Sequence, residues 1–264
     1  MNLRRIVTNS IAGCAISLIA TACNGIFDGV YDEAPTTASV TTEGQLLVDA
    51  SSWHDWYYVD FDSLQGFIER KDTAGLLKAQ STFTRYPIPT TLSSGTGDGK
   101  TGTYIYWFDV FGKGLSVNEK RSFTATDVQP EPASWSLAFH RNNVRTNGAA
   151  ALETKYTSMT ALPKNSSAFL GASFQEDEWS ENQVWDDQSQ MLSSLIGCQG
   201  IKINKVLSSW LRLDIPPMPP AFTMNNHVFI VRLKNDKYAA VQLENYIGTD
   251  GTKCWLRINY KYPY

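Results

Sequence analysis

The sequence contains few of the residues that enzymes use for catalysis. Its 264 residues include only three histidines, His54, His140 and His227, and four cysteines. The histidines lie in unrelated segments, and none is paired in the sequence with a nucleophile and an orienting partner. The G-x-S-x-G, H-E-x-x-H, P-loop and Rossmann glycine patterns are also absent. We therefore predict that the protein is not an enzyme, and that His140 is a buried, hydrogen-bonded structural residue.

Cysteine is too sparse for a disulfide framework, and the sequence has no C-x-x-C pair that would indicate structural zinc. Cys14 and Cys23 belong to an N-terminal targeting segment. The remaining two, Cys198 and Cys254, form either one disulfide or two buried thiols. Both alternatives stay open, because the sequence does not give the distance between them.

The N-terminal apolar run, residues 11–22, is too short to remain as a membrane anchor, since about 20 residues are needed to span a bilayer. Together with Arg4 and Arg5 it predicts a signal peptide over residues 1–22. The A-T-A-C segment that ends at Cys23 resembles a bacterial lipobox, which would make Cys23 the lipidated first residue of the mature chain. The alternative is a plain secretory signal with an incidental cysteine.

The mature chain is predicted to consist of a tether and one domain. Residues 23–44 are acidic and threonine-rich without periodicity, which is typical of a tether, and their N-G-I-F-D-G-V-Y-D-E-A-P segment resembles the export signal of surface lipoproteins in Bacteroidetes-type bacteria. Residues 45–264 remain for the domain. The formal net charge is −3, and this mildly acidic balance argues against nucleic acid as a partner.

The domain is predicted to be mainly β, because no helix-period apolar stripe of useful length is present. We expect a single sandwich- or barrel-like antiparallel β domain with few short helices and long functional loops. Residues 158–199 interrupt the strand pattern and are expected to form a long irregular excursion. Strands are predicted at residues 45–50, 53–61, 104–111, 135–140, 152–157, 229–233, 238–243 and 254–262.

The most informative segment is residues 134–148, S-W-S-L-A-F-H-R-N-N-V-R-T-N-G. Its first half alternates apolar and small or polar residues, which predicts a strand with one face on a core. Its second half is a polar elbow that ends in Asn147-Gly148, the dipeptide that most readily reverses the chain. Arg141 and Arg145 in this elbow carry planar donor groups that suit pairing with carboxylates.

The same segment carries a family resemblance. In the form W-S-L-A-F-H-R-N-N-V-R-T-N-G it resembles the hallmark segment of the HmuY-like haem-binding lipoproteins. Residues 229–246 and the terminal Y-K-Y-P also look like the closing strands of that family, and the match is weakest at residues 62–103. The resemblance implies an all-β lipoprotein, lipid-anchored at the outer membrane and exposed on the cell surface. It would bind haem as cargo and deliver it to a TonB-dependent outer-membrane receptor.

The resemblance also implies a ligand set for haem iron. The family holds the iron through two axial side chains, which are histidines in some members and methionines in others. This sequence has no histidine between His140 and His227, but Met159 and Met191 look similar to the family's ligand positions. Thioether sulfur is a known axial ligand of haem and suits reduced iron. We therefore expect Met159 and Met191 to be the axial ligands of haem iron.

Other residues near this expected site are open to more than one interpretation. Met218 and Met224 are rival ligands, although each is better explained as structural. Phe174, Trp179 and Trp185 are either the apolar walls of a porphyrin site or ordinary core residues.

Two alternatives remain at the level of function. The arginines of the elbow either pin loops through carboxylates, which we favour, or reach the propionates of haem. The chain itself either binds haem or keeps the fold as a surface lipoprotein with an adhesion or glycan-binding function. In the second case Trp179 and Trp185 would stack on sugar rings.

Overall fold

The structure is a computed structural model that describes residues 44–88, 103–109, 119–124, 130–188, 191–193, 195–214 and 220–264. The predicted signal peptide, the lipidation site Cys23, nearly all of the tether and the rival ligand Met218 lie outside these residues. Within the described part of the chain, no helix is long and apolar enough to cross a membrane.

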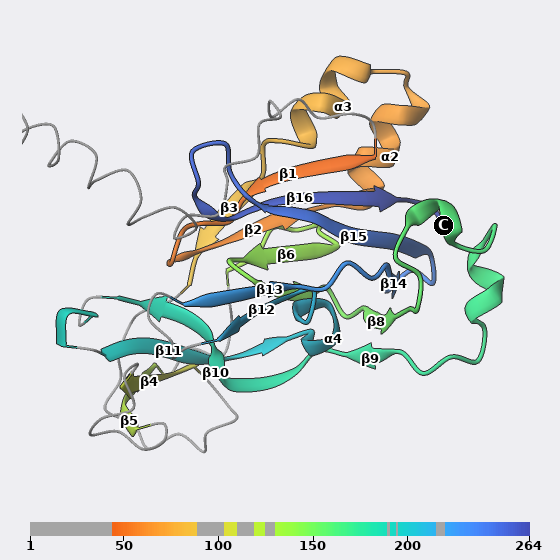
Figure 1. Cartoon of the computed structure of the whole chain (residues 1–264). Coiled ribbons are helices and arrows are strands. Elements are labelled where there is room, and N and C mark those ends of the chain that lie inside the picture. The colour runs from red at the N-terminus through yellow and green to blue at the C-terminus, as the bar shows by residue number, and fades with distance from the viewer. Residues whose placement is uncertain are drawn as a thin grey trace, which may run out of the picture.

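The strands form antiparallel sheets, as predicted from the sequence (Figure 1). The largest sheet has the order β1 (Gln45–Asp49), β16 (Lys253–Lys261), β15 (Tyr238–Ile247), β14 (Phe229–Arg232), β8 (Ala150–Glu153) and β9 (Gln175–Glu176). A second sheet has the order β3 (Thr84–Pro87), β2 (Asp55–Val59), β6 (Leu137–His140) and β7 (Asn143–Thr146). A third has the order β10 (Glu178–Asp187), β11 (Leu195–Ile203), β4 (Thr103–Asp109) and β5 (Glu119–Thr124), and β12 (Leu211–Asp214) pairs with β13 (Ala221–Met224).

The helices are few and short, which agrees with the predicted mainly β class. They are α2 (Phe61–Glu69), α3 (Thr73–Ala79) and α4 (Lys205–Ser208), with the 3-10 turns η1 (Met159–Ala161), η2 (Ser166–Phe169) and η3 (Met191–Ser193). The strand predicted at residues 53–61 is shorter in the structure, because β2 ends at Val59. Asp60 then caps α2, because its carboxylate accepts a hydrogen bond from the Asp62 backbone N–H at 3.1 Å.

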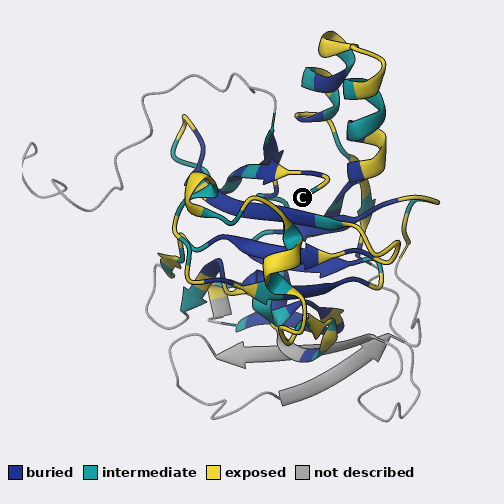
Figure 2. Ribbon diagram, turned by 90° about the vertical axis from the view of Figure 1, so that its right-hand side faces the viewer, coloured by how far each residue is buried: buried dark blue, intermediate teal, exposed yellow. Residues whose placement is uncertain are grey.

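The β2-β3-β6-β7 sheet lies between the other two large sheets (Figure 1), and its strands β6 and β7 are covered on both faces. Leu137 and Phe139 join the main core cluster against the six-stranded sheet, whereas Ala138 joins a second cluster with Val184 of β10 and Ile201 of β11. All residues of β6 are buried, and the ribbon in the middle of the molecule is mostly dark blue in Figure 2. The period-two prediction for this segment is therefore confirmed, but the prediction of a single core face is wrong, since a third layer covers the other side.

Two predicted turns are confirmed by the backbone. Gly148 follows Asn147 with a φ of 62°, where β7 turns towards β8. Asp236 has a φ of 59° in the β14–β15 hairpin, which the sequence analysis placed at Asn235-Asp236. Asn and Asp tolerate this left-handed region better than most residues.

The predicted irregular excursion at residues 158–199 is only half correct. Its first part has the short turns η1 and η2, but its second part enters the long strands β10 and β11. The register of this pair shifts between Ser180 and Val184 and again between Trp185 and Asp187. These irregularities break the strict alternation of a strand, which is why the sequence did not predict β10.

The structure also decides between the two alternatives for cysteine. Cys198 and Cys254 are both buried, and no disulfide joins them. Burial raises the pKa of the Cys254 thiol.

Candidate functional site

The structure divides the predicted haem-site residues into two pairs. Met159 and Phe174 pack in one hydrophobic cluster, which we call the Met159 cluster. Met191 and Trp185 pack in another, which we call the Met191 cluster. Of the three aromatic residues predicted as possible porphyrin walls, Phe174 therefore accompanies Met159, and Trp179 and Trp185 accompany Met191.

The Met159 cluster lies on one face of the six-stranded sheet. Val228, Ile230 and Ala240 form its buried floor. Met159 is at the start of η1, a turn whose N-cap Ser158 accepts a hydrogen bond from Thr160 N–H at 3.2 Å. The partly buried side chains packed on the floor are those of Tyr156, Met159, Leu162, Phe169, Phe174, Tyr238 and Tyr264.

Aromatic contacts and cations surround this cluster. The ring centroids of Phe174 and Tyr238 are 6.0 Å apart in an edge-to-face arrangement. Three cations each lie over an aromatic ring of the cluster, at distances from the ring centroid of 5.9 Å for Lys155 on Tyr156, 5.2 Å for Arg232 on Phe174 and 5.0 Å for Lys261 on Tyr264. A partly buried aromatic surface with a cationic rim suits a flat apolar ligand that has anionic groups at its edge.

The Met191 cluster lies beside the β10–β11 hairpin. Its buried members are Trp185, Ile196 and Cys198, and the partly buried Trp53, Trp179, Met191 and Leu213 pack against them. Met191 itself belongs to η3, between the two strands of the hairpin. The next residue, Leu192, is fully exposed, so the described end of this hairpin presents an apolar side chain to solvent.

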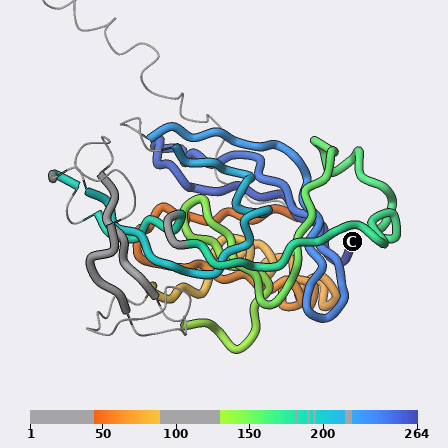
Figure 3. The backbone as a smooth tube through the Cα atoms, turned by 90° about the horizontal axis from the view of Figure 1, so that it is seen from below, coloured from red at the N-terminus to blue at the C-terminus, as the bar shows by residue number. Residues whose placement is uncertain are grey.

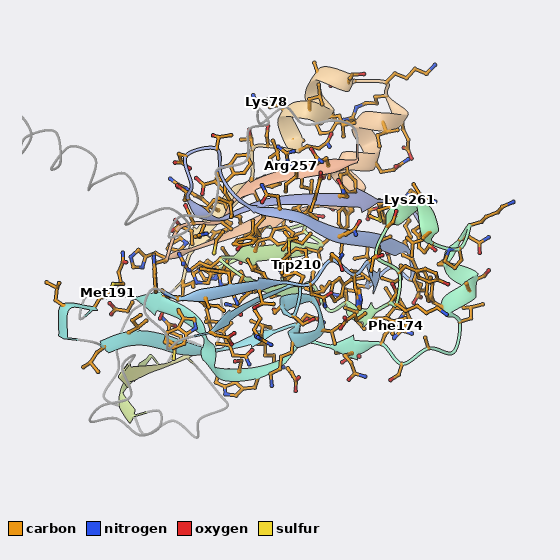
Figure 4. All side chains as sticks on the ribbon, viewed as in Figure 1. Lys78, Phe174, Met191, Trp210, Arg257 and Lys261 are labelled. Carbon is orange, nitrogen blue, oxygen red and sulfur yellow. The ribbon has the colours of Figure 1, made fainter. Side chains whose placement is uncertain are left out.

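The two methionines are not brought together. Figure 4 places Met191 on the left of the molecule, and Phe174 and Lys261 of the other cluster on the right. The view from below in Figure 3 shows the same separation between the teal hairpin and the green excursion. In this conformation the two thioethers therefore do not face each other across one porphyrin. Of the rival ligands, Met224 ends β13 and is 39% exposed.

His140 has a structural role, as predicted. Its Nδ1 and Nε2 atoms each lie 3.0 Å from a backbone carbonyl oxygen, of Asp55 and of Trp185 respectively. Burial is the main reason that the pKa of His140 is lowered to about 4, and nearby positive charge lowers it further. The two carbonyl contacts act in the opposite direction. The ring is thus fully enclosed and has no access to a ligand. Elsewhere in the described residues, no group of three or more His, Cys, Asp or Glu side chains is placed to hold a metal ion.

The two arginines of the elbow differ from each other. Arg145 pairs with Glu131, as expected for a residue that pins loops. Arg141 instead donates from Nη1 to the Ser51 carbonyl at 2.9 Å and stacks over Trp53 at 4.2 Å from the ring centroid. Within the described part of the chain it has no carboxylate at ion-pair distance, and burial lowers its pKa. The pinning prediction is therefore confirmed for Arg145 through a carboxylate, and for Arg141 only through a carbonyl and a ring.

A polar cleft beside the elbow was not predicted from the sequence. The cleft has a volume of about 460 Å³ and is lined by Asn142, Asn143, Lys205 and Arg212 among others. The consecutive asparagines were visible in the sequence, but α4 and the β12–β13 hairpin, which complete the cleft, come from more than 60 positions further along the chain.

The fold and these clusters define an antiparallel β protein with layered sheets and partly buried aromatic surfaces. The family to which this β protein belongs follows from its sequence. The sequence profile of the HmuY protein family matches residues 52–260. The chain therefore belongs to the HmuY family, which confirms the resemblance noted in the sequence.

Solved structures give the same fold. An HmuY-like heme-binding protein from Bacteroides vulgatus is 26% identical, with 86% of this chain and 97% of that chain covered and a TM-score of 0.53. A lipoprotein from Bacteroides fragilis is 25% identical, with coverage of 87% and 99% and a TM-score of 0.56. Apo PinO from Porphyromonas gingivitis, at 19% identity, 85% and 97% coverage and a TM-score of 0.57, supports the fold alone. No curated protein matches the sequence.

Proposed function

We propose that this protein binds haem as cargo. The observation that carries the proposal is its membership of the HmuY family over residues 52–260. A structural relative described as HmuY-like and heme-binding, which is similar over 86% of this chain, supports it. The aromatic surface and cationic rim of the Met159 cluster are also chemically suited to a porphyrin and its propionates.

We propose the Met159 cluster as the porphyrin surface, with Met159 as an axial ligand. Its thioether is partly exposed beside Phe174 and Tyr238, and the buried floor of Val228, Ile230 and Ala240 excludes water from one side. Haem iron is bound well by methionine sulfur, especially when reduced. Met191 stays the proposed second ligand, but only a conformational change on binding would carry its hairpin to the Met159 cluster.

The location and route of delivery are part of the same proposal. Cys23 would carry lipid that anchors the chain to the outer membrane, with the tether placing the domain at the cell surface. The B. fragilis relative, described as a lipoprotein, supports this anchoring. Haem would then pass to a TonB-dependent outer-membrane receptor.

A haem titration of the purified protein tests the proposal. We expect a shift of the Soret band, and a larger affinity for reduced than for oxidised haem because thioether is a soft ligand. Met159→Ala should weaken binding by at least about tenfold, equivalent to about 1.4 kcal/mol. Met224→Ala, which removes a thioether outside both clusters, is the matched control and should leave the titration unchanged.

The variants separate the parts of the proposal. Absence of a Soret shift in both redox states would contradict haem binding itself. A shift that persists in the Met159→Ala, Met191→Ala double variant would contradict the methionine ligands but leave haem as the cargo. A loss on Met191→Ala equal to that on Met159→Ala would support movement of the hairpin on binding.

A further inference from the structure

The polar cleft borders the Met191 cluster, with which it shares Trp185 and Leu213, but most of its lining residues are polar. It lies where the β6–β7 turn, β10, α4 and the β12–β13 hairpin meet. Its volume of about 460 Å³ is within the range of small-molecule sites, about 300–1,000 Å³. Four segments that are distant in the sequence thus form a cleft of a size that fits a small ligand.

The lining of the cleft contains polar and apolar surface in similar amounts. Amide side chains and hydroxyls from Asn142, Gln183, Thr223 and Asn225 take part in its lining, and Trp185 and Leu213 are the apolar residues among the described ones that line it. A porphyrin needs a predominantly apolar pocket. A ligand that matches this lining must instead be rich in groups that both donate and accept hydrogen bonds, as sugar hydroxyls do.

The floor of the cleft is held in place by internal hydrogen bonds. Ser208 Oγ accepts from Val144 N–H at 2.9 Å, and Trp210 Nε1 donates to the Asn142 carbonyl at 3.3 Å. Asn143 Nδ2 donates to the Gln183 carbonyl at 2.9 Å. These bonds join the β6–β7 turn to α4 and β10, so a ligand would meet a largely preformed surface and lose less entropy on binding.

Several donors and acceptors of the lining are not used within the protein. The side chains of Gln183 and Thr223 have no hydrogen-bond partner among the described residues. Arg212 uses Nε to bind Asp214 at 3.1 Å, which leaves its two terminal NH₂ groups available. The cleft thus offers an amide, a hydroxyl and a guanidinium to a ligand.

The charged residues that line the cleft are cations, and each has a carboxylate partner outside the lining. Lys205 and Arg212 both line it, whereas their carboxylate partners, Glu178 and Asp214, do not belong to its described lining. No other acidic residue is among the described residues that line the cleft. Both cations are therefore paired with a carboxylate, Lys205 with Glu178 at 3.4 Å and Arg212 with Asp214 at 3.1 Å. The terminal N–H groups that Arg212 keeps available still favour a ligand that carries a carboxylate as well as hydroxyls.

From these observations we propose that the cleft binds a carboxylated sugar of the uronic acid type. Arg212 would hold the carboxylate through its planar pair of terminal N–H groups, with the Lys205 ammonium as a further hydrogen-bond donor. Asn142, Gln183 and Thr223 would bond the ring hydroxyls. Trp185 would present an apolar wall to the C–H face of the ring.

The test compares glucuronic acid with glucose, which has the same ring but CH₂OH in place of the carboxylate. Saturation-transfer NMR and calorimetry on the purified protein should detect glucuronate and give an affinity for glucose weaker by about tenfold or more. Arg212→Gln should remove that preference. Lys202→Gln, which deletes an exposed charge on β11 outside the cleft, is the matched control and should keep it.

Several outcomes would contradict the proposal. No signal with glucuronate, or equal affinity for the two sugars in the unaltered protein, would overturn it, as would a preference that persists in Arg212→Gln. The same variant should keep its haem titration unchanged. Loss of haem binding in Arg212→Gln would assign the cleft to haem, whereas failure of haem binding in every variant would leave the sugar result intact.

Discussion

His140 Nε2 lies 3.0 Å from the carbonyl oxygen of Trp185, a residue 45 positions further along the chain. The other ring nitrogen lies 3.0 Å from the carbonyl of Asp55. One buried imidazole therefore connects β6 to β2 within its own sheet and to β10 of the neighbouring sheet. A neutral imidazole carries one N–H and an imidazolium two, so protonation would satisfy both carbonyls, but complete burial opposes the charge more strongly.

This balance predicts a pH-dependent stability. The pKa of His140 falls from 6.5 to about 4 on folding, so between these values the unfolded chain binds more protons than the folded one. The stability contributed by the neutral ring is fully present above pH 6.5 and is lost as the pH falls towards 4. The full shift corresponds to about 3 kcal/mol. Chemical denaturation at a series of pH values should show the free energy of unfolding decreasing over this range.

The variant His140→Gln should flatten this pH dependence, although it also lowers stability at neutral pH by removing a packed ring. The matched control is His54→Gln, which replaces an exposed histidine and keeps His140. An unchanged pH profile in His140→Gln would show that other groups cause the acid sensitivity.

The contacts of Arg145 predict that arginine and lysine at this position differ in their contribution to stability, although both carry one positive charge. Its guanidinium pairs with Glu131 and lies 4.9 Å from the ring centroid of Trp135 and 5.7 Å from that of Trp56. Lysine keeps the charge but loses the planar group that stacks and forks. We expect Arg145→Lys to lower the free energy of unfolding by about 1–2 kcal/mol in chemical denaturation.

An exposed arginine provides the comparison for this substitution. Arg70 lies over the single ring of Phe67 at 5.0 Å at the end of α2, and Arg70→Lys should cost less than about 0.5 kcal/mol. Equal effects of the two substitutions would mean that the planar group of Arg145 does not contribute beyond its charge.

The sequence predicted those parts of the fold whose signals are local. The alternation in residues 135–140 and the turns at Asn147-Gly148 and Asn235-Asp236 depend on residues close together in the chain, and all three are observed. The burial of the second face of β6 depends on Val184 and Ile201 instead. Nothing in the local pattern indicates which distant strand will cover it.

The same distinction explains the separation of the methionines. In the sequence, Met159 and Met191 lie at the two ends of one predicted excursion, and the family resemblance implied that both would bind one haem iron. The ten residues of β10 lie between them, and a strand of that length spans about 30 Å. The bulges that hid β10 from the sequence analysis thus also hid the distance between the two predicted ligands.

The position of Gly200 predicts that one added methyl group would destabilise the Met191 cluster. A Cβ at Gly200 would lie 2.5 Å from Cζ2 of Trp179 and 3.1 Å from its Cε2. The indole is rigid and packs in the Met191 cluster, so it cannot give way without disturbing its neighbours. Gly200→Ala should lower the free energy of unfolding by about 1–3 kcal/mol, as expected for overpacking, measured by thermal or chemical denaturation.

The control is a second glycine, Gly66, at which the same substitution should change the free energy of unfolding in the opposite direction. Gly66 lies within α2, and a Cβ there would meet only the flexible end of Arg70, at 3.1 Å from Nη1. Gly66→Ala should therefore raise stability by about 0.5–1 kcal/mol, because alanine is the better helix former. The cause of the Gly200 effect is then isolated by adding Trp179→Ala. If the indole is the obstacle, Gly200→Ala will cost less in the Trp179→Ala background than alone, and strictly additive effects would place the strain elsewhere.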